Sequence, residues 1–272
     1  MSPFRASAPL TDTWEHFRFS VSDGIGTVTL DRPGKLNALT FEAYADLRDL
    51  LAELPHRGDT RVLVIRGNGR AFCSGGDVNE IIGATLAMSP DELLAFTRMS
   101  GEVIREMRDC PVPIIAAVHG MAAGAGAVIA LAADFRVCTP AARFAFLFTK
   151  VGLSGGDMGA AYLLPRLVGL GHATRLLMLG DTVNAEEAER IGLVSRVVPA
   201  ATYDDEVDAT LQQISRAPTT ALALTKWLFY KLDSLSFDDG VAAGVVTNVE
   251  ARSTEDFKKG VRRFTERRSR PE

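Results

Sequence analysis

Two glycine-rich turns, each placed after an apolar run, are the residues best suited to chemistry. Residues 72–77 read Phe-Cys-Ser-Gly-Gly-Asp and follow the apolar run 62–65. Residues 119–126 read His-Gly-Met-Ala-Ala-Gly-Ala-Gly and follow the run 114–118. They open an apolar helix whose first turn, residues 124–127, has no side chain larger than methyl. The first N–H groups of a helix lack partners within it and carry partial positive charge.

Bare N–H groups in two neighbouring turns are what an oxyanion hole requires, since small residues let a ligand approach the backbone closely. Tight packing of the helix is the alternative interpretation, and Gly and Ala alone do not distinguish the two. The presence of a second glycine-rich turn favours the oxyanion hole.

Taken together, the two turns resemble the two signatures of the crotonase (enoyl-CoA hydratase/isomerase) superfamily, and the similarity runs from about Trp14 to Arg268. The resemblance implies an α/β fold, a crotonase-like spiral of ββα units with a C-terminal helical appendage. It implies that the N–H groups of Gly76 and Ala125 bind the thioester oxygen of an acyl-CoA. The expected activity is that of an enoyl-CoA hydratase/isomerase, a lyase or isomerase that stabilises a thioester enolate.

The same resemblance places the loop 31–39 beside coenzyme A. A phosphate contact and a solvated side chain stay equally open for Lys35. The segment 257–268, which contains Phe264, resembles the C-terminal part of the superfamily's proteins. That part packs on a neighbouring subunit and closes the CoA site of that subunit. The expected substrate-binding residues are Lys35, Leu36, Ala38, Cys73, Ser74, Gly76, Ala125 and Phe264. No metal and no cofactor are expected other than the coenzyme A of the substrate.

The expected acid/base residues differ from those of the superfamily's hydratases. These hydratases use two glutamates, and the matching positions here are Val128 and about Phe148, neither of them acidic. Asp157, in a third glycine-rich turn, resembles the catalytic aspartate of dienoyl-CoA isomerases and the nucleophilic aspartate of chlorobenzoyl-CoA dehalogenase. A carboxylate in an apolar pocket has a raised pKa and can shuttle a proton. The alternative is that Asp157 caps the helix that begins near Met158.

Two classes of function therefore stay open. The first is an acyl-CoA enzyme, a hydratase or isomerase, or a hydrolase or dehalogenase that uses Asp157. The second is a catalytically impaired protein that only binds acyl-CoA. Asp77 is interpreted as structural because a carboxylate after such a turn holds backbone N–H groups. His119, at a strand end, is interpreted as a hydrogen-bonding core residue.

Composition limits the choice further. The chain has 272 residues, of which 47% are hydrophobic, and a net charge of −4, which gives no pull toward nucleic acid. No apolar run is long enough for a membrane span, and no secretory signal is visible. Its three cysteines, at positions 73, 110 and 138, are an odd count without metal-ligand spacing. They indicate reduced thiols and a cytoplasmic protein.

The expected organisation is a flexible tail (1–13), a crotonase-like core (14–199) and a C-terminal helical oligomerisation region (200–272) that makes a homotrimer or homohexamer. Alternating strands and helices indicate a mostly parallel sheet. Residues 78–89 are interpreted as a mobile lid. The expected strands are 17–21, 27–30, 61–66, 112–118, 135–138, 143–148 and 193–198. The expected helices are 41–54, 90–109, 124–134, 160–168, 172–179, 185–191, 204–215, 219–232, 237–252 and 254–268.

Overall fold

Two β-sheets make up the centre of the fold in the computed structural model, which describes residue 11 and residues 13–268. The main sheet has the strand order β1-β2-β3-β4-β6-β9, and the smaller one β5-β7-β8. β1 and β2 form an antiparallel hairpin, and the rest of the main sheet is parallel, as predicted. The strands are β1 (Arg18–Ser22), β2 (Ile25–Leu30), β3 (Val62–Gly67), β4 (Ile114–Val118), β5 (Met121–Ala123), β6 (Phe135–Cys138), β7 (Arg143–Ala145), β8 (Thr182–Asn184) and β9 (Arg196–Val197).

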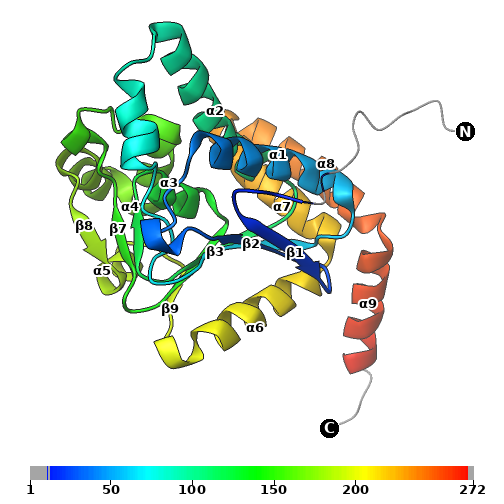
Figure 1. Ribbon diagram of the computed structural model, residues 1–272. Coiled ribbons are helices and arrows are strands. Elements are labelled where there is room, and N and C mark those ends of the chain that lie inside the picture. Colours follow the sequence, from blue (N-terminus) through cyan, green and yellow to red (C-terminus); the bar gives the residue numbers. More distant parts are fainter. Residues whose placement is uncertain (1–10, 12, 269–272) are drawn as a thin grey trace, which may run out of the picture.

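Helices cover both sheets and form the C-terminal part of the chain (Figure 1). Short 3-10 and π-helices join them; η2 (Val78–Gly83), η3 (Phe148–Val151), η4 (Asp157–Gly159) and η5 (Arg175–Leu179) are used below. The α-helices are α1 (Phe41–Arg57), α2 (Pro90–Asp109), α3 (Ala125–Ala132), α4 (Ala160–Thr174), α5 (Ala185–Arg190), α6 (Tyr203–Ser215), α7 (Thr219–Lys231), α8 (Phe237–Arg252) and α9 (Glu255–Arg268).

The described elements differ from the predicted ones in a few places. β5 and β8 are three residues long each and were not predicted, because such short strands carry no periodicity. The predicted strand 143–148 ends at Ala145, and Phe148 begins the 3-10 helix η3. The predicted lid opens with the π-helix η2, whose mobility stays a prediction. Residues 1–10 and 12 of the predicted tail lie outside the described residues.

The main sheet is buried on both faces, as parallel sheets normally are. On β3, Leu63 and Ile65 join the core under α1, α2 and α3, whereas Val62 and Val64 point to the opposite face and pack with α6. Figure 1 shows α1 and α6 on opposite sides of this sheet. α6 thus covers the core, although the boundary at residue 199 placed it in the C-terminal region; that boundary stays a prediction.

The local signals that set the helices are visible in the structure. Ser89 and Glu92 form a capping box, and Pro90 is the first residue of α2, as predicted. Thr40 accepts a hydrogen bond from the N–H of Ala43 and caps α1. The two helices predicted at 160–168 and 172–179 are separated by a non-helical residue, Gly169, with φ of 76°.

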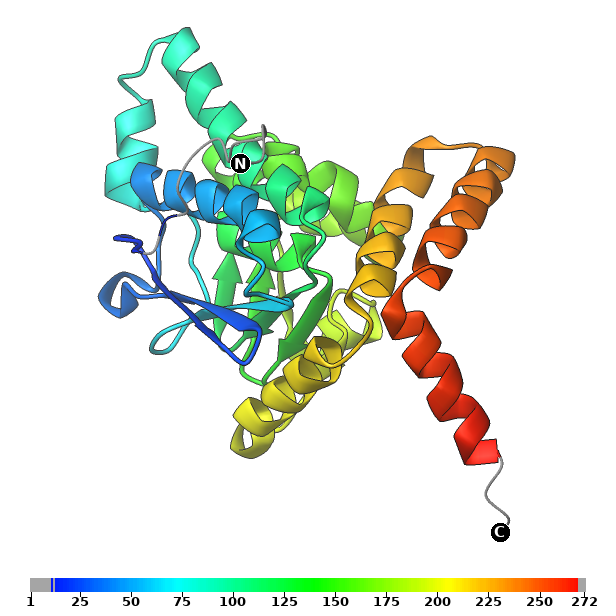
Figure 2. The ribbon, with the colours of Figure 1, turned by 90° about the vertical axis from the view of Figure 1, so that its right-hand side faces the viewer.

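The last three helices leave the body of the molecule, as Figure 2 shows for α9 in red. They are attached through α7 by a buried ion pair. The Nζ of Lys226 lies 2.8 Å from the Oδ2 of Asp134 and donates to the carbonyl of Val112 at 3.0 Å. Asp134 also accepts hydrogen bonds from the N–H of Ile114 and the hydroxyl of Tyr230. The pair therefore joins α7 to the start of β4.

Removing the charge of Lys226 tests this attachment. In Lys226→Met, Asp134 keeps two donors but loses its counter-ion while it stays largely buried, which costs about 3 kcal/mol of the free energy of unfolding. Chemical denaturation followed by circular dichroism measures the change. The matched control is Lys231→Met, on the exposed end of the same helix, which should change stability by less than about 0.5 kcal/mol. Equal losses in the two variants would contradict this role.

Candidate active site

The two glycine-rich turns lie side by side because backbone hydrogen bonds join them. The N–H groups of Phe72 and Cys73 donate to the carbonyl of Met121 at 3.0 and 3.1 Å, and the N–H of Ala123 donates to the carbonyl of Cys73 at 2.9 Å. The N–H of Gly124 donates to the carbonyl of Ala145, on β7, at 2.9 Å. The small sheet that was not predicted in full therefore holds both turns in place.

Glycine is required where the two turns meet. A Cβ on Gly126 would lie 2.3 Å from the carbonyl oxygen of Cys73, so any side chain would force the turns apart. Gly75 has a φ of 98°, and a Cβ there would lie 2.9 Å from the carbonyl oxygen of Ala123 and 3.4 Å from the backbone nitrogen of Ala125. The glycines fix the distance between the turns, and Ala125 comes to lie next to residues 75 and 76.

The N–H groups of Gly76 and Ala125 donate no hydrogen bond within the described part of the chain. Their neighbours are bonded: Leu39 donates to the carbonyl of Gly75, and Asp77 donates to the carbonyl of Leu39, both at 2.8 Å. Ala125 is the first residue of α3, where the helix has no partner for its N–H. The arrangement leaves one unused donor on each of the two adjoining turns, and their use as an oxyanion hole stays a prediction.

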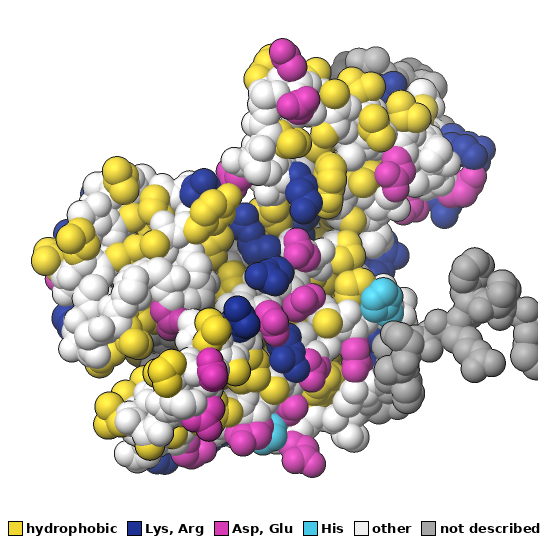
Figure 3. All heavy atoms as spheres, turned by 90° about the horizontal axis from the view of Figure 1, so that it is seen from above, with side chains coloured by type: hydrophobic (Ala, Val, Ile, Leu, Met, Phe, Trp, Pro, Cys, Tyr) yellow, Lys and Arg dark blue, Asp and Glu magenta, His cyan; other side chains and the backbone are white. Residues whose placement is uncertain are grey.

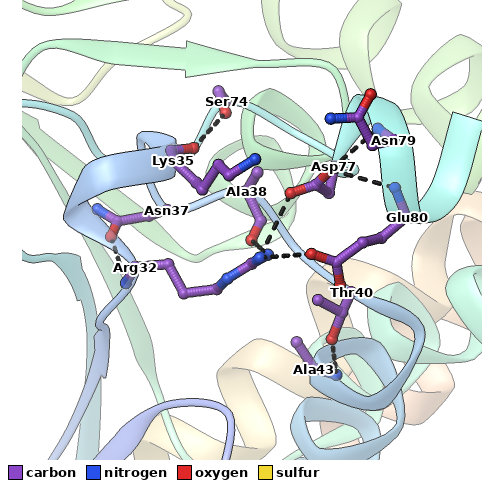
Figure 4. A network of polar contacts seen from close by, with 10 residues as sticks. All are labelled: Arg32, Lys35, Asn37, Ala38, Thr40, Ala43, Ser74, Asp77, Asn79 and Glu80. Carbon is purple, nitrogen blue, oxygen red and sulfur yellow. Dashed lines mark hydrogen bonds and ion pairs between the residues drawn. The ribbon is translucent and has the colours of Figure 1, made fainter.

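The loop 31–39 is tied to the first turn, as Figure 4 shows. The Arg32 guanidinium donates to the carbonyl of Ala38 at 2.8 Å, and the amide of Asn37 donates to the carbonyls of Ala71 and Phe72. The N–H of Ser74 donates to the carbonyl of Leu36 at 3.0 Å. Two hydrogen-bonded stretches of backbone next to Gly76 therefore contain the expected binding residues Lys35, Leu36, Ala38, Cys73 and Ser74. Lys35 is exposed, and its phosphate contact stays a prediction.

Two further carboxylates near the turns are engaged. The Oδ1 of Asp77 accepts the N–H groups of Asn79 and Glu80 at 3.0 and 3.2 Å, and these bonds, more than the charges of Lys35 and Arg32, lower its pKa. Glu80 pairs with Arg32 at 2.8 Å. The structural interpretation of Asp77 is confirmed, and both groups hold the start of η2 (Figure 4).

Asp157 differs from these carboxylates. It is partly buried, and its carboxylate interacts with the N–H of Met158, so the capping interpretation stays open beside the catalytic one. Burial raises its pKa, and the N–H of Met158 lowers it by a smaller amount. Met158 adopts φ 50° and ψ 21°, a left-handed conformation that costs a non-glycine residue about 1 kcal/mol or more. Such strain next to an underused carboxylate is typical of a functional site.

The positions that match the superfamily's glutamates are apolar and enclosed. Val128 on α3 and Phe148 on η3 belong to the same core cluster as Ala125 and Met158. η4 contacts both α2 and α3, which brings Asp157 close to this cluster. His119 donates through Nε2 to the carbonyl of Gly69 at 2.8 Å and holds a loop. Asp157 is the carboxylate of this region whose side chain is least engaged.

A cavity of about 870 Å³ begins beside the residues that follow Asp157. It lies between α2 and the start of α4, and Met158 and Gly159 form part of its wall. Figure 3 shows Lys and Arg side chains gathered in the middle of the face seen from above. The lining of the cavity includes three arginines, Arg98, Arg105 and Arg108, together with Glu102.

Phe264 does not lie with these residues within one chain. It is an exposed residue of α9, the helix that projects from the core in Figure 2. A contact with the site of another subunit, as the resemblance implied, stays a prediction.

Comparison with known proteins gives the family. The model of the enoyl-CoA hydratase/isomerase family matches residues 20–271. The chain belongs to the enoyl-CoA hydratase/isomerase family. A protein of Rhodobacter capsulatus named a probable enoyl-CoA hydratase is 35% identical over 94% of this chain and 97% of its own length. The 1,2-epoxyphenylacetyl-CoA isomerase of Escherichia coli is 32% identical over 92% and 95%.

The crystal structure of a protein from Streptomyces coelicolor A3(2) that is described as an enoyl-CoA hydratase has a TM-score of 0.94 and 58% identity to this chain. The match covers 100% of this chain and 98% of that one. The crotonase-like fold and the assignment to an enzyme of the enoyl-CoA hydratase/isomerase type are confirmed. The hydrolase, dehalogenase and impaired binding protein are not favoured, since these relatives are hydratases and isomerases by name.

Sequence reasoning missed two polar residues that lie beside the first glycine-rich turn. Arg32 bonds Ala38 and Glu80, but an arginine in a loop is indistinguishable from a solvated one by sequence. Tyr44 lies on the buried face of α1 beside Gly76. A tyrosine in the apolar stripe formed by Leu47, Leu50 and Leu51 was the available signal.

The unused N–H of Ala125 can be removed by a single substitution. Ala125→Pro fits the first position of a helix, so the fold should persist while one donor is lost. We expect a loss of about 3 kcal/mol of transition-state stabilisation, on the order of 100-fold in turnover of an enoyl-CoA substrate. The matched control is Ala185→Pro at the first position of α5, far from the site in sequence, which should keep full turnover. Full activity in both folded variants would rule out this donor.

Proposed function

We propose that this enzyme isomerises the double bond of an acyl-CoA by proton transfer through Asp157. The observation that carries the proposal is the pairing of two unbonded N–H groups, at Gly76 and Ala125, with one weakly engaged carboxylate. The apolar Val128 and Phe148 provide no second acid for a water molecule. One carboxylate is sufficient to move a proton between two carbons.

The chemistry follows from these groups. The carboxylate of Asp157 takes a proton from a carbon of the acyl chain, and the electron pair moves toward the thioester oxygen. The N–H groups of Gly76 and Ala125 donate to that oxygen and lower the energy of the enolate. In a 3-enoyl thioester the proton leaves the α carbon and a dienolate forms; Asp157 then returns the proton to the γ carbon, which gives the 2-enoyl product. The apolar side chains of Val128 and Phe148 offer no group that would hold a water molecule for addition to the double bond.

Hydration is the second candidate reaction, and the name of the Rhodobacter relative favours it. It requires a group that orients water, and in the cluster around Ala125 the matching positions are filled by Val128 and Phe148. We propose that no cofactor beyond the coenzyme A of the substrate takes part, because amide groups and a carboxylate account for every step. A cytoplasmic location agrees with the three buried, unpaired cysteines. Within the described residues no helix is long and apolar enough to cross a membrane.

We also propose a homo-oligomer, a trimer or a dimer of trimers. Large apolar side chains are exposed along the helices that leave the core. Exposed apolar surface of this kind is typical of a protein–protein interface. On α7 and α8 these include Trp227, Phe229, Phe237, Val245 and Val249. α9 carries Phe257, Val261 and Phe264 in the same exposed position.

Asp157→Asn tests the proton transfer. It keeps the size of the side chain but removes the titratable proton, so turnover of 3-enoyl-CoA thioesters should fall on the order of 100-fold or more. Formation of the conjugated 2-enoyl product is followed by its ultraviolet absorbance. In the wild type, the base must be ionised and its pKa is raised, so kcat/KM should fall as the pH decreases through a value above the usual carboxylate range.

This acid limb should be absent in Asp157→Asn. Folding provides the control: because burial disfavours the charged form, the carboxylate lowers stability at neutral pH, and the asparagine variant should melt at the same or a higher temperature. A lower melting temperature with unchanged turnover per folded protein would instead assign Asp157 a structural role.

The oligomer is tested by the mass in solution. Light scattering should give three or six times the chain mass of 29.3 kDa. Phe229→Asp, in the exposed apolar surface of α7, should dissociate it, whereas Leu86→Asp, in an exposed turn before α2, should not. A concentration-independent monomer in the wild type would contradict the proposal.

A further inference from the structure

Tyr44 is a buried tyrosine that points at the first glycine-rich turn. It lies on the core-facing side of α1, only 3% exposed, and its ring packs edge-on against Phe96 with the ring centres 5.7 Å apart. Its hydroxyl is 3.6 Å from the position that a Cβ on Gly76 would take. The hydroxyl therefore lies beside the residue that supplies one of the two unused N–H groups.

The Tyr44 hydroxyl has no hydrogen-bond partner among the described residues, whereas buried tyrosines normally find one. The other three tyrosines behave differently. Tyr162 and Tyr230 donate to aspartates, and the hydroxyl of Tyr203 is fully enclosed. The hydroxyl of Tyr44 is not among the fully enclosed unpartnered atoms, and it lies beside Gly76.

We propose that Tyr44 is a further catalytic residue, whose hydroxyl donates a hydrogen bond to the acyl group of the substrate beside Gly76. The inference rests on the proposed function, because it requires an acyl thioester in this site. The acceptor that lies nearest to Gly76 is the thioester oxygen, which gains negative charge as the enolate forms. The hydroxyl adds a third donor to the N–H groups of Gly76 and Ala125. The hydrogen bond that it donates becomes stronger as negative charge develops on the thioester oxygen.

The environment of Tyr44 keeps it a donor. Burial raises the pKa of its hydroxyl far above the usual range, and the negative charge of Asp157 raises it further. A group with a raised pKa of this kind stays protonated at every working pH. Tyr44 therefore does not act as a base, and the acid limb of the pH profile belongs to Asp157.

Tyr44→Phe tests the proposal, because it removes one oxygen and keeps the packing against Phe96. We expect kcat for 3-enoyl-CoA isomerisation to fall on the order of 100-fold, KM to change little, and the acid limb to stay where it is in the wild type. The matched control is Tyr203→Phe, which removes a buried, unpartnered hydroxyl from the separate cluster under α6 and should keep full kcat. Wild-type kcat in Tyr44→Phe, or an equal loss in the control, would overturn the proposal.

A binding measurement separates this result from the choice of reaction. The absorbance of cinnamoyl-CoA shifts to longer wavelength when donors polarise its thioester carbonyl, and the shift requires no turnover. The wild type should show the shift, Tyr203→Phe should retain it, and Tyr44→Phe should show a smaller one. An equal shift in Tyr44→Phe would overturn the role of Tyr44 alone. The lack of any shift in the wild type would overturn both Tyr44 and the acyl thioester site.

Discussion

The close contact between two stretches of backbone is the constraint on which the rest of the structure depends. The carbonyl oxygen of Cys73 occupies the space that a Cβ of residue 126 would need, and hydrogen bonds on either side hold the two stretches at that distance. One stretch follows β3 and the other follows β4, and these two strands are neighbours in the main sheet. Because both turns follow neighbouring parallel strands, they meet at the same edge of the sheet, and each turn has one unused N–H group.

A site built from backbone donors leaves the side chains to decide which reaction follows. Val128 and Phe148 belong to the apolar core cluster around Ala125. Burial disfavours the charged form of the Asp157 carboxylate and therefore raises its pKa. Two other carboxylates of the region are held in structural contacts: Asp77 accepts two backbone N–H groups, and Glu80 pairs with Arg32. In the proposed isomerisation two unbonded N–H groups act with this one carboxylate, which can move a proton between two carbons but leaves no second acid for the addition of water.

Local signals in the sequence were sufficient for much of this fold. Ser89 and Pro90 fixed the start of α2, and the two glycine-rich turns indicated the position of the unused donors, because both depend on neighbours in sequence. β5 and β8 could not be predicted, since strands of three residues are stabilised by their partners rather than by their own pattern. The direction in which Tyr44 points is equally non-local: α1 and η2 must first pack together before Gly76 comes within reach.

The C-terminal region shows how non-local contacts divide one apparent unit. α6 buries Val207 and Leu211 against the back of the main sheet and is part of the core. α7 is attached through Lys226 and Asp134, a polar contact that fixes an orientation, although such pairs add little net stability compared with apolar packing. α8 and α9 keep exposed Phe237, Val245 and Phe257. The buried ion pair therefore gives α7 a fixed orientation on the core, and α8 and α9 continue from it with exposed apolar side chains.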